Sequence, residues 1–375
     1  MLERKSHYRG LIALQLVPGL GLQRARILLQ QLRAEDASEL FRCSIRELTK
    51  TDGIGENVAG NLVRFNEWQK VDRILLQTQK AGARFIAFDD EHYPELLRHI
   101  YDPPLILWLR GSSEALTAPG IGVVGTRRPG RYGLSQTVEW VKNLVSSNVS
   151  VNSGLAYGVD TAAHRETLDA GGKTVAVLGS GINVIYPARN SGLAKRITEQ
   201  GGALITEYPP NTPPDAVNFP GRNRIVSGMS HGILVVESGI KGGSMITARY
   251  ALDQNREVFV VPHPLGYAGG EGCNYLIRTG QGKLVQTPDD IFDELSIGPA
   301  DVIKSTQLHP GEAWKKLDLS PGQTEICKAL NVDKLHIDVL CEKLNLPGYK
   351  VLPEMLELEM RGVVRQSAGK YFELV

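Results

Sequence analysis

Between residues 117 and 295, short apolar runs alternate with helical segments. The runs are rich in Val, Ile and Leu and cover residues 121–125, 149–153, 174–179, 203–207, 233–237, 258–262 and 284–286. Most are separated by helical stretches at 134–147, 161–170, 193–200 and 244–254. Near-continuous apolar strands that alternate with helices are typical of a parallel sheet covered on both faces. The pattern predicts an α/β fold with an extended Rossmann-like, doubly wound, mostly parallel sheet.

The segments on either side of this region predict two smaller domains. Residues 1–70 contain two similar turns, at 17–21 and 52–55, each with two glycines before a helical run. This repeat favours a helix-hairpin-helix (SAM-like) domain, whose glycines either expose helix N-termini to phosphate or only permit a tight turn. Residues 71–295 form the Rossmann-like domain, with a lead-in at 71–116. A linker at 296–312 precedes a winged-helix domain at 313–375, which has three helices and a terminal hairpin.

Charge and composition limit the classes of function. The net charge is only +1, so nucleic-acid binding would need local clusters of Arg and Lys. The four cysteines are scattered, which argues against disulfides and against a zinc site. No apolar run reaches the roughly 18 residues of a membrane span. We therefore expect a cytoplasmic protein without a metal ion.

The residues after the first predicted strand differ from a dinucleotide site. In the segment 125–133, Gly125 is followed by the three arginines Arg127, Arg128 and Arg131, where a dinucleotide fold would place G-x-G-x-x-G. Residues 171–174 resemble the end of a P-loop, but a strand follows them instead of a helix. We therefore expect no nucleotide cofactor.

Other strand ends carry small or basic residues that suit a nucleic-acid strand. Ser153 and Gly154 end the second strand, and Asp160 is the expected N-cap of the helix that follows it. Gly243 and Ser244 open a later helix. In the segment 218–228, Arg222 and Arg224 flank Asn223 at a helix start, and the aromatic Phe219 lies three residues before Arg222. Aromatic faces and guanidinium planes stack on bases, and guanidinium groups pair with phosphates. Carboxyl ends of parallel strands meet at one edge, so these residues should converge there.

Six ordered motifs resemble one known family. They are Val-Gly-Thr-Arg-Arg-Pro (124–129), Ser-Gly-Leu-Ala-Tyr-Gly-Val-Asp (153–160), Val-Leu-Gly-Ser-Gly-Ile-Asn-Val-Ile-Tyr-Pro (177–187), Thr-Glu-Tyr-Pro (206–209), Phe-Pro-Gly-Arg-Asn-Arg-Ile-Val-Ser-Gly (219–228) and Gly-Gly-Ser-Met-Ile-Thr-Ala-Arg (242–249). Together they resemble the DprA (Smf) DNA-processing proteins. The resemblance implies a non-enzymatic homodimer, joined through the Rossmann-like domain, that binds and protects incoming single-stranded DNA. It also implies help in loading RecA recombinase during DNA uptake and recombination.

The resemblance also indicates which residues would contact DNA. Where the family often has a basic residue, this chain has Gly192, and we expect Lys195 or Arg196, a turn later, to take its place. His164 matches the family pattern but is expected to be a structural hydrogen-bonding residue. The predicted DNA-binding set is Arg127, Arg128, Arg131, Ser153, Gly154, Lys195, Phe219, Arg222, Asn223, Arg224, Gly243, Ser244 and Thr247.

Two other functions remain open at this stage. The first is a nucleotide-binding sensor or an enzyme similar to the lysine-decarboxylase-like phosphoribohydrolases. For it, Glu207 and Glu237 at strand ends are the candidate catalytic groups. The second is a regulator that reads duplex DNA with the winged helix. The expected recognition helix at 350–360 disfavours it, because three glutamates there would face an anionic groove.

Overall fold

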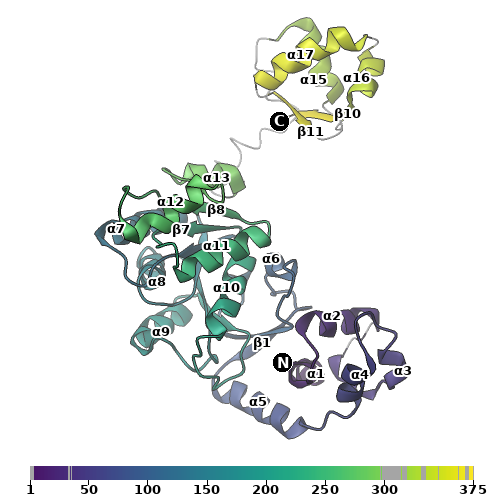
Figure 1. Cartoon of the computed structure of the whole chain (residues 1–375), viewed down its shortest axis with the longest axis vertical. Coiled ribbons are helices and arrows are strands. Elements are labelled where there is room, and N and C mark those ends of the chain that lie inside the picture. Colours follow the sequence, from purple (N-terminus) through teal and green to yellow (C-terminus); the bar gives the residue numbers. More distant parts are fainter. Residues whose placement is uncertain are drawn as a thin grey trace. The chain divides into compact units, whose positions relative to one another are not determined.

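The computed structural model describes residues 4–32, 34, 36–295, 297, 314, 319–330, 335–344, 346–361, 363–367 and 371–374. The chain forms two compact units, Met1–Ile297 and Gly298–Val375. Figure 1 shows the α/β layers of the first unit and the small helical second unit. No helix among the described residues is both long and apolar enough to cross a membrane.

The first unit is built on one sheet, which has nine strands within the described residues, in the order β1-β2-β6-β5-β4-β3-β7-β8-β9. Seven strands run parallel to their neighbours: β3 (Gly120–Val124), β4 (Ser150–Ser153), β5 (Thr174–Val177), β6 (Ala203–Thr206), β7 (Gly232–Val235), β8 (Glu257–Val260) and β9 (Lys283–Leu284). The lead-in adds β2 (Ile106–Gly111), which is antiparallel to β6, and β1 (Arg84–Ala87), which is antiparallel to β2.

Helices cover both faces of the sheet, because alternate strand residues point in opposite directions. On β7, Leu234 packs with α7 (Arg131–Ser146), α8 (Val159–Asp169) and α13 (Asp289–Leu295). Its neighbours Ile233 and Val235 pack with α10 (Asn218–Gly228), α11 (Gly243–Asp253) and α12 (Glu271–Arg278). A further helix, α9 (Ser191–Glu199), joins β5 to β6. The predicted doubly wound, mostly parallel fold is confirmed.

The seven predicted strands differ from the observed ones by at most two residues at either end. Most of the differences lie at the carboxyl ends. There, Leu178, Val236 and Val261 stay buried beyond the last paired residue, so apolar character outlasts the strand. The apolar run in the sequence therefore marks the buried segment, which extends past the hydrogen-bonded part of each strand.

The N-terminal helices are α1 (Lys5–Leu16), α2 (Leu22–Gln31), α3 (Ile45–Leu48), α4 (Glu56–Val63) and α5 (Trp68–Lys80), with a 3-10 turn, η1, at Ala37–Arg42. The two repeated turns are built alike. Gly19 and Gly53 have φ of +79° and +77°, which favours glycine. Gly21 and Gly55 then precede the first residues of α2 and α4.

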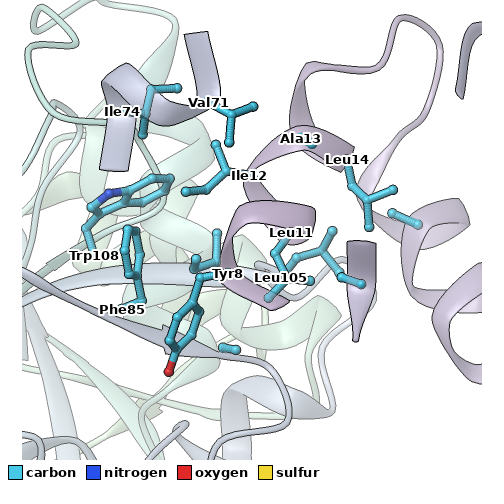
Figure 2. Close-up of a cluster of buried hydrophobic side chains, with 14 of the residues drawn as sticks. Tyr8, Leu11, Ile12, Ala13, Leu14, Val71, Ile74, Phe85, Leu105 and Trp108 are labelled. Carbon is cyan, nitrogen blue, oxygen red and sulfur yellow. The ribbon is translucent and has the colours of Figure 1, made fainter. Parts of the chain in front are cut away.

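Helix α1 shares a hydrophobic core with the sheet. Figure 2 shows Ile12 of α1 facing Val71 and Ile74 of α5, with Trp108 of β2 beside them. The buried Trp108 indole donates a hydrogen bond of 2.9 Å to the Thr78 hydroxyl. The N-terminal helices therefore belong to the same compact unit as the sheet. Helix α5 runs through the domain boundary expected at residue 70, which stays a prediction.

The second unit has the winged-helix order that the sequence predicts. Helices α15 (Pro321–Leu330), α16 (Ile337–Leu344) and α17 (Gly348–Met360) pack on a three-stranded sheet of β10 (Leu335–His336), β12 (Tyr371–Leu374) and β11 (Val364–Ser367). Leu340, Met355 and Phe372 lie in its core. Helix α17 exposes Tyr349 and Met360 beside two exposed glutamates, Glu357 and Glu359. The predicted linker at 296–312 lies outside the described residues except for residue 297.

Candidate nucleic-acid interface

The topology of the sheet opens a crevice at one place. The chain forms β3, β4, β5 and β6 in order on one side, and then crosses to place β7 on the other side of β3. Loops that leave β3 and β7 therefore diverge, which opens a crevice beyond their carboxyl ends. Open α/β sheets bind ligands in such a crevice.

A pocket of about 690 Å³ occupies this crevice; we call it the edge pocket. Its walls come from the loops after β3 and β4 and from the first turns of α10 and α11. Eight of the thirteen predicted DNA-binding residues line it: Arg127, Gly154, Phe219, Arg222, Asn223, Gly243, Ser244 and Thr247. The expected convergence of distant motifs at one sheet edge is thus present in the structure.

One wall of the edge pocket is a stack of cationic and aromatic side chains. The exposed Arg127 guanidinium lies 5.8 Å from the centre of the Phe219 ring. The Tyr186 ring lies 5.7 Å from Phe219 and is inclined to it by 44°. The guanidinium of Arg127 has no hydrogen-bond or ion-pair partner among the described residues. It is therefore free to meet an anion while Phe219 and Tyr186 offer ring faces to a base.

The base of the edge pocket is fixed by a buried arginine. Arg222 is 5% exposed, and its guanidinium donates hydrogen bonds to the carbonyls of Gly154 and Val177. Burial lowers the pKa of Arg222 to about 10, although the nearby Asp160 carboxylate opposes that shift. A side chain at position 154 would collide with this guanidinium, since a Cβ there would lie 2.4 Å from it. Gly154 therefore serves close packing around Arg222.

Asp160 does not cap α8, as the sequence had suggested. The N-cap is Gly158, with φ of +76°, and Asp160 lies in the first turn of the helix. Its carboxylate reaches back and accepts hydrogen bonds from the amides of Gly154 (3.1 Å) and Ala156 (3.3 Å). The prediction was wrong because the carboxylate caps the preceding loop instead of the helix. Asp160 therefore holds the loop that separates β4 from α8.

His164 is a buried structural residue, and we expect it to make stability depend on pH. Its Nδ1 lies 2.7 Å from the Thr174 hydroxyl, while Nε2 is buried without a partner among the described residues. Burial lowers the pKa of His164 from 6.5 to about 3. Only the unfolded chain takes up this proton below pH 6.5, so stability falls from there towards pH 3.

Lowering the pH from 7 to 5 should cost about 2 kcal/mol through His164, at about 1.4 kcal/mol per pH unit below its unfolded pKa. Urea unfolding of the wild type and of His164→Gln at both pH values measures it. Glutamine keeps a polar group near Thr174 but does not titrate, so the variant should lose less stability on acidification. An equal loss in the two proteins would show that His164 is not the source.

Comparison with known protein families decides the assignment. The model of the DNA recombination-mediator protein A family matches residues 84–296, which is more than half of the chain. The chain belongs to the DprA/Smf family. A second model, that of the DprA winged-helix domain, matches residues 310–370. The family resemblance of the six motifs is therefore confirmed.

Relatives within the DprA/Smf family align with most of the chain. The Smf protein of Escherichia coli is 36% identical over 306 residues, covering 82% of this chain and 81% of that protein. The DNA processing protein DprA of Bacillus subtilis is 36% identical over 272 residues, which is 72% of this chain and 90% of the relative.

Two solved structures of DprA proteins share the fold. The crystal structure of Streptococcus pneumoniae DprA superposes with a TM-score of 0.66 at 30% identity, covering 76% of this chain and 97% of that one. The protein from Helicobacter pylori superposes with a TM-score of 0.52 at 27% identity, covering 58% and 97%. Its structure is described as showing a single-stranded DNA binding mode.

Five predicted residues of this DprA-family chain lie outside the lining of the edge pocket. Arg128 is exposed in the loop before α7, and Arg131 is exposed at the start of that helix. Ser153 is fully buried, and its hydroxyl donates to the carbonyl of Val123 at 2.7 Å. Lys195 is exposed on α9 and pairs with Glu199 at 3.6 Å. The structure therefore does not gather these four with the stack, and the fifth, Arg224, is described next.

Arg224 faces away from the edge pocket. Its side chain is 7% exposed and forms ion pairs with Glu207 and, at 3.2 Å, with Asp102. Burial raises the pKa of Glu207, and the charge of Arg224 acts against that rise. These contacts join α10 to the carboxyl end of β6 and to the segment before β2. Arg224 thus has a structural role in the described chain.

The two glutamates considered for an enzyme are both engaged in the fold. The Glu237 carboxylate accepts hydrogen bonds from the amide of Gly130 (3.1 and 3.2 Å) and from the hydroxyl of Tyr267 (2.9 Å). It anchors the loop that carries Arg127. Glu207 is paired with Arg224. Neither glutamate lines the edge pocket.

Sequence reasoning missed several residues that shape the edge pocket. Tyr186 lies in one of the six motifs but is not among the predicted DNA-binding residues, although its ring completes the aromatic wall of the pocket. Pro214, Ala216 and Ile246 also line the pocket, from the segment before α10 and from the first turn of α11. The signal available in the sequence was a tyrosine next to a proline at the end of the motif that follows a strand.

Proposed function

We propose that this DNA processing protein binds single-stranded DNA in the edge pocket. The observation that supports it best is the stack of Arg127 on Phe219, with Tyr186 beside it, at the sheet's ligand edge. A single strand exposes both phosphates and base faces, so the guanidinium group can bind a phosphate while the aromatic rings stack on bases. The DNA-binding relative from Helicobacter pylori, which shares the fold, supports the same substrate.

Each part of the pocket has a separate task in this proposal. Arg127 pairs with a phosphate, while Phe219 and Tyr186 stack on bases, which gives binding with little sequence preference. The amides of Gly243 and Ser244, at the start of α11, add donors for a second phosphate. The Ser244 hydroxyl is already bonded to Ser238 at 2.7 Å, so its backbone amide is the available donor.

The remaining family properties belong to the same proposal. We infer a non-enzymatic, cytoplasmic homodimer that protects single-stranded DNA and helps to load RecA recombinase during DNA uptake and recombination. Belonging to the recombination-mediator family supports this role. The engagement of Glu207 and Glu237 in structural contacts argues against the nucleotide enzyme. Release of base from nucleoside monophosphates by the purified chain would contradict the non-enzymatic part.

Replacing Arg127 by Ala is expected to weaken binding of labelled oligo-dT about tenfold, or about 1.4 kcal/mol. One lost phosphate contact should also reduce the slope of log affinity against log salt by roughly 0.7. Fluorescence anisotropy at several salt concentrations measures both. Arg73→Ala, which removes an exposed charge on α5, is the matched control. The pocket assignment fails if the two variants bind alike, or if a duplex binds more tightly than the single strand.

A further inference from the structure

A second pocket, of about 410 Å³, lies between α8 and α9; we call it the arginine pocket. Its volume falls within the range of roughly 300–1,000 Å³ that is usual for ligand sites. Three arginines line it, and none of its described lining residues is acidic: Leu134, Tyr157, Gly158, Thr161, Ala162, Arg165, Arg189, Asn190, Leu193 and Arg196. The pocket is therefore a concave, basic surface.

Two of its three charges are not used by the fold. The guanidinium groups of Arg165 and Arg189 are exposed and have no hydrogen-bond or ion-pair partner within the described ranges. Only Arg196 is paired, with Asp169 at 2.7 Å. The nearby Glu166 is already paired with Lys142, at 3.4 Å. Two uncompensated cations in one hollow attract an anion with at least two charges.

The arginine pocket adjoins the edge pocket across two loops. In the loop after β4, Ala156 lines the edge pocket and the next residue, Tyr157, lines the arginine pocket. In the second loop, Tyr186 lines the edge pocket and Arg189 lines the arginine pocket. Each of these two loops therefore contributes to the walls of both pockets.

The wall between the pockets is fixed and carries aromatic groups. The Asn190 side-chain amide donates to the carbonyl of Leu155 and to the hydroxyl of Thr161, both at 2.9 Å, which ties the two loops together. Tyr157 and Tyr186 are 45% and 43% exposed. Exposed rings on a rigid ridge between two basic hollows suit bases that are linked by a backbone.

We propose that the arginine pocket binds the continuation of the same single DNA strand that occupies the edge pocket. Arg165 and Arg189 pair with successive phosphates, and Tyr157 stacks on a base as the strand crosses the ridge. This inference rests on the proposed function and extends it, since it sets a minimum strand length for full binding. A free nucleotide would fill one pocket only and would leave the other, and the tyrosine ridge, unused.

The test uses the full chain and fluorescein-labelled oligo-dT of about 4 and about 20 nucleotides, which bracket the site sizes of ~4–16 nucleotides known for single-strand-binding folds. The variant is the double substitution Arg165→Ala/Arg189→Ala. Its control is Arg73→Ala/Lys173→Ala, which removes the same charge from α5 and from the residue before β5, at the opposite edge of the sheet. All four side chains are exposed, so all variants should fold.

We expect the arginine-pocket variant to bind the long oligonucleotide about tenfold more weakly than the control does, and the short one equally well. The salt slope for the long strand should fall by roughly 1.4, since each lost phosphate contact removes about 0.7. Equal affinity of variant and control for the long strand would overturn the inference, as would an equal loss on both lengths.

The outcome also separates this inference from the function on which it rests. If Arg127→Ala weakens binding of both lengths while the arginine-pocket variant behaves like its control, the edge pocket stands and only the extension fails. If the wild-type chain binds neither oligonucleotide, the proposed function and the extension fail together.

Discussion

Replacing Arg224 by Ala is expected to lower the free energy of unfolding by about 3–5 kcal/mol, as for a buried ion pair that loses one partner. The Arg224 side chain is 7% exposed, and Glu207 beside it is 12% exposed. Removing the guanidinium leaves the Glu207 carboxylate buried without its cation, and burial already raises its pKa. Urea unfolding at pH 7 measures the loss.

The same variant should leave the salt slope of oligo-dT binding unchanged once the folded fraction is accounted for. Arg127→Ala is the matched comparison, because that side chain is exposed and should change the slope without changing stability. In the double variant Arg224→Ala/Glu207→Gln, part of the stability should return, since no unpaired charge remains. A smaller slope in Arg224→Ala with full stability would restore Arg224 as a DNA contact.

The different roles of Arg222 and Arg224 follow from helix geometry. An α-helix turns about 100° per residue, so residues two apart point in nearly opposite directions. Phe219, Arg222, Asn223 and Val226 are spaced by three and four residues, and all four line the edge pocket. The sequence motif predicts a helix start near Arg222, but α10 begins at Asn218. In a helix that begins at Asn218, Arg222 and Arg224 lie on nearly opposite faces, so Arg224 points away from the pocket that Arg222 lines.

Other features of the site were predictable because they depend on topology. The apolar runs set the strands, and their carboxyl ends must share one edge in a parallel sheet. The sequence alone therefore predicts that Arg127, Gly154 and Gly243 lie close together, and all three line the edge pocket.

Contacts between distant side chains were not predictable in the same way. The hydrogen bond from the Gly130 amide to Glu237 joins residues 107 positions apart and depends on how two loops meet. Glu237 therefore resembled a catalytic acid in the sequence, whereas the structure uses it to support the Arg127 loop. The arginine pocket has the same origin, because its charges come from separate segments: Arg165 from α8, Arg189 from the 3-10 turn at Ala188–Asn190, and Arg196 from α9.

Arg222→Ala is expected to lower the free energy of unfolding by about 3–5 kcal/mol. We also expect the protein that stays folded to bind DNA more weakly. The guanidinium is buried, and without it the carbonyls of Gly154 and Val177 would lose their donor. The buried Asp160 would also lose its neighbouring cation, and burial raises its pKa. Binding should fall because the 154–160 loop forms part of the edge pocket.

The Arg222–Asp160 pair should not itself be a source of net stability. Burial raises the pKa of Asp160 and lowers that of Arg222, although the charge of each opposes the shift of the other. Removing both charges therefore also removes the cost of burying them. The double variant Arg222→Met/Asp160→Asn should therefore be more stable than Arg222→Ala, because it removes both charges and fills much of the volume. It should still bind oligo-dT less well than the wild type, since Met cannot hold the carbonyls that shape the pocket. Urea unfolding and anisotropy on the three proteins measure both quantities. Full DNA affinity in the double variant would show that Arg222 shapes no part of the binding surface.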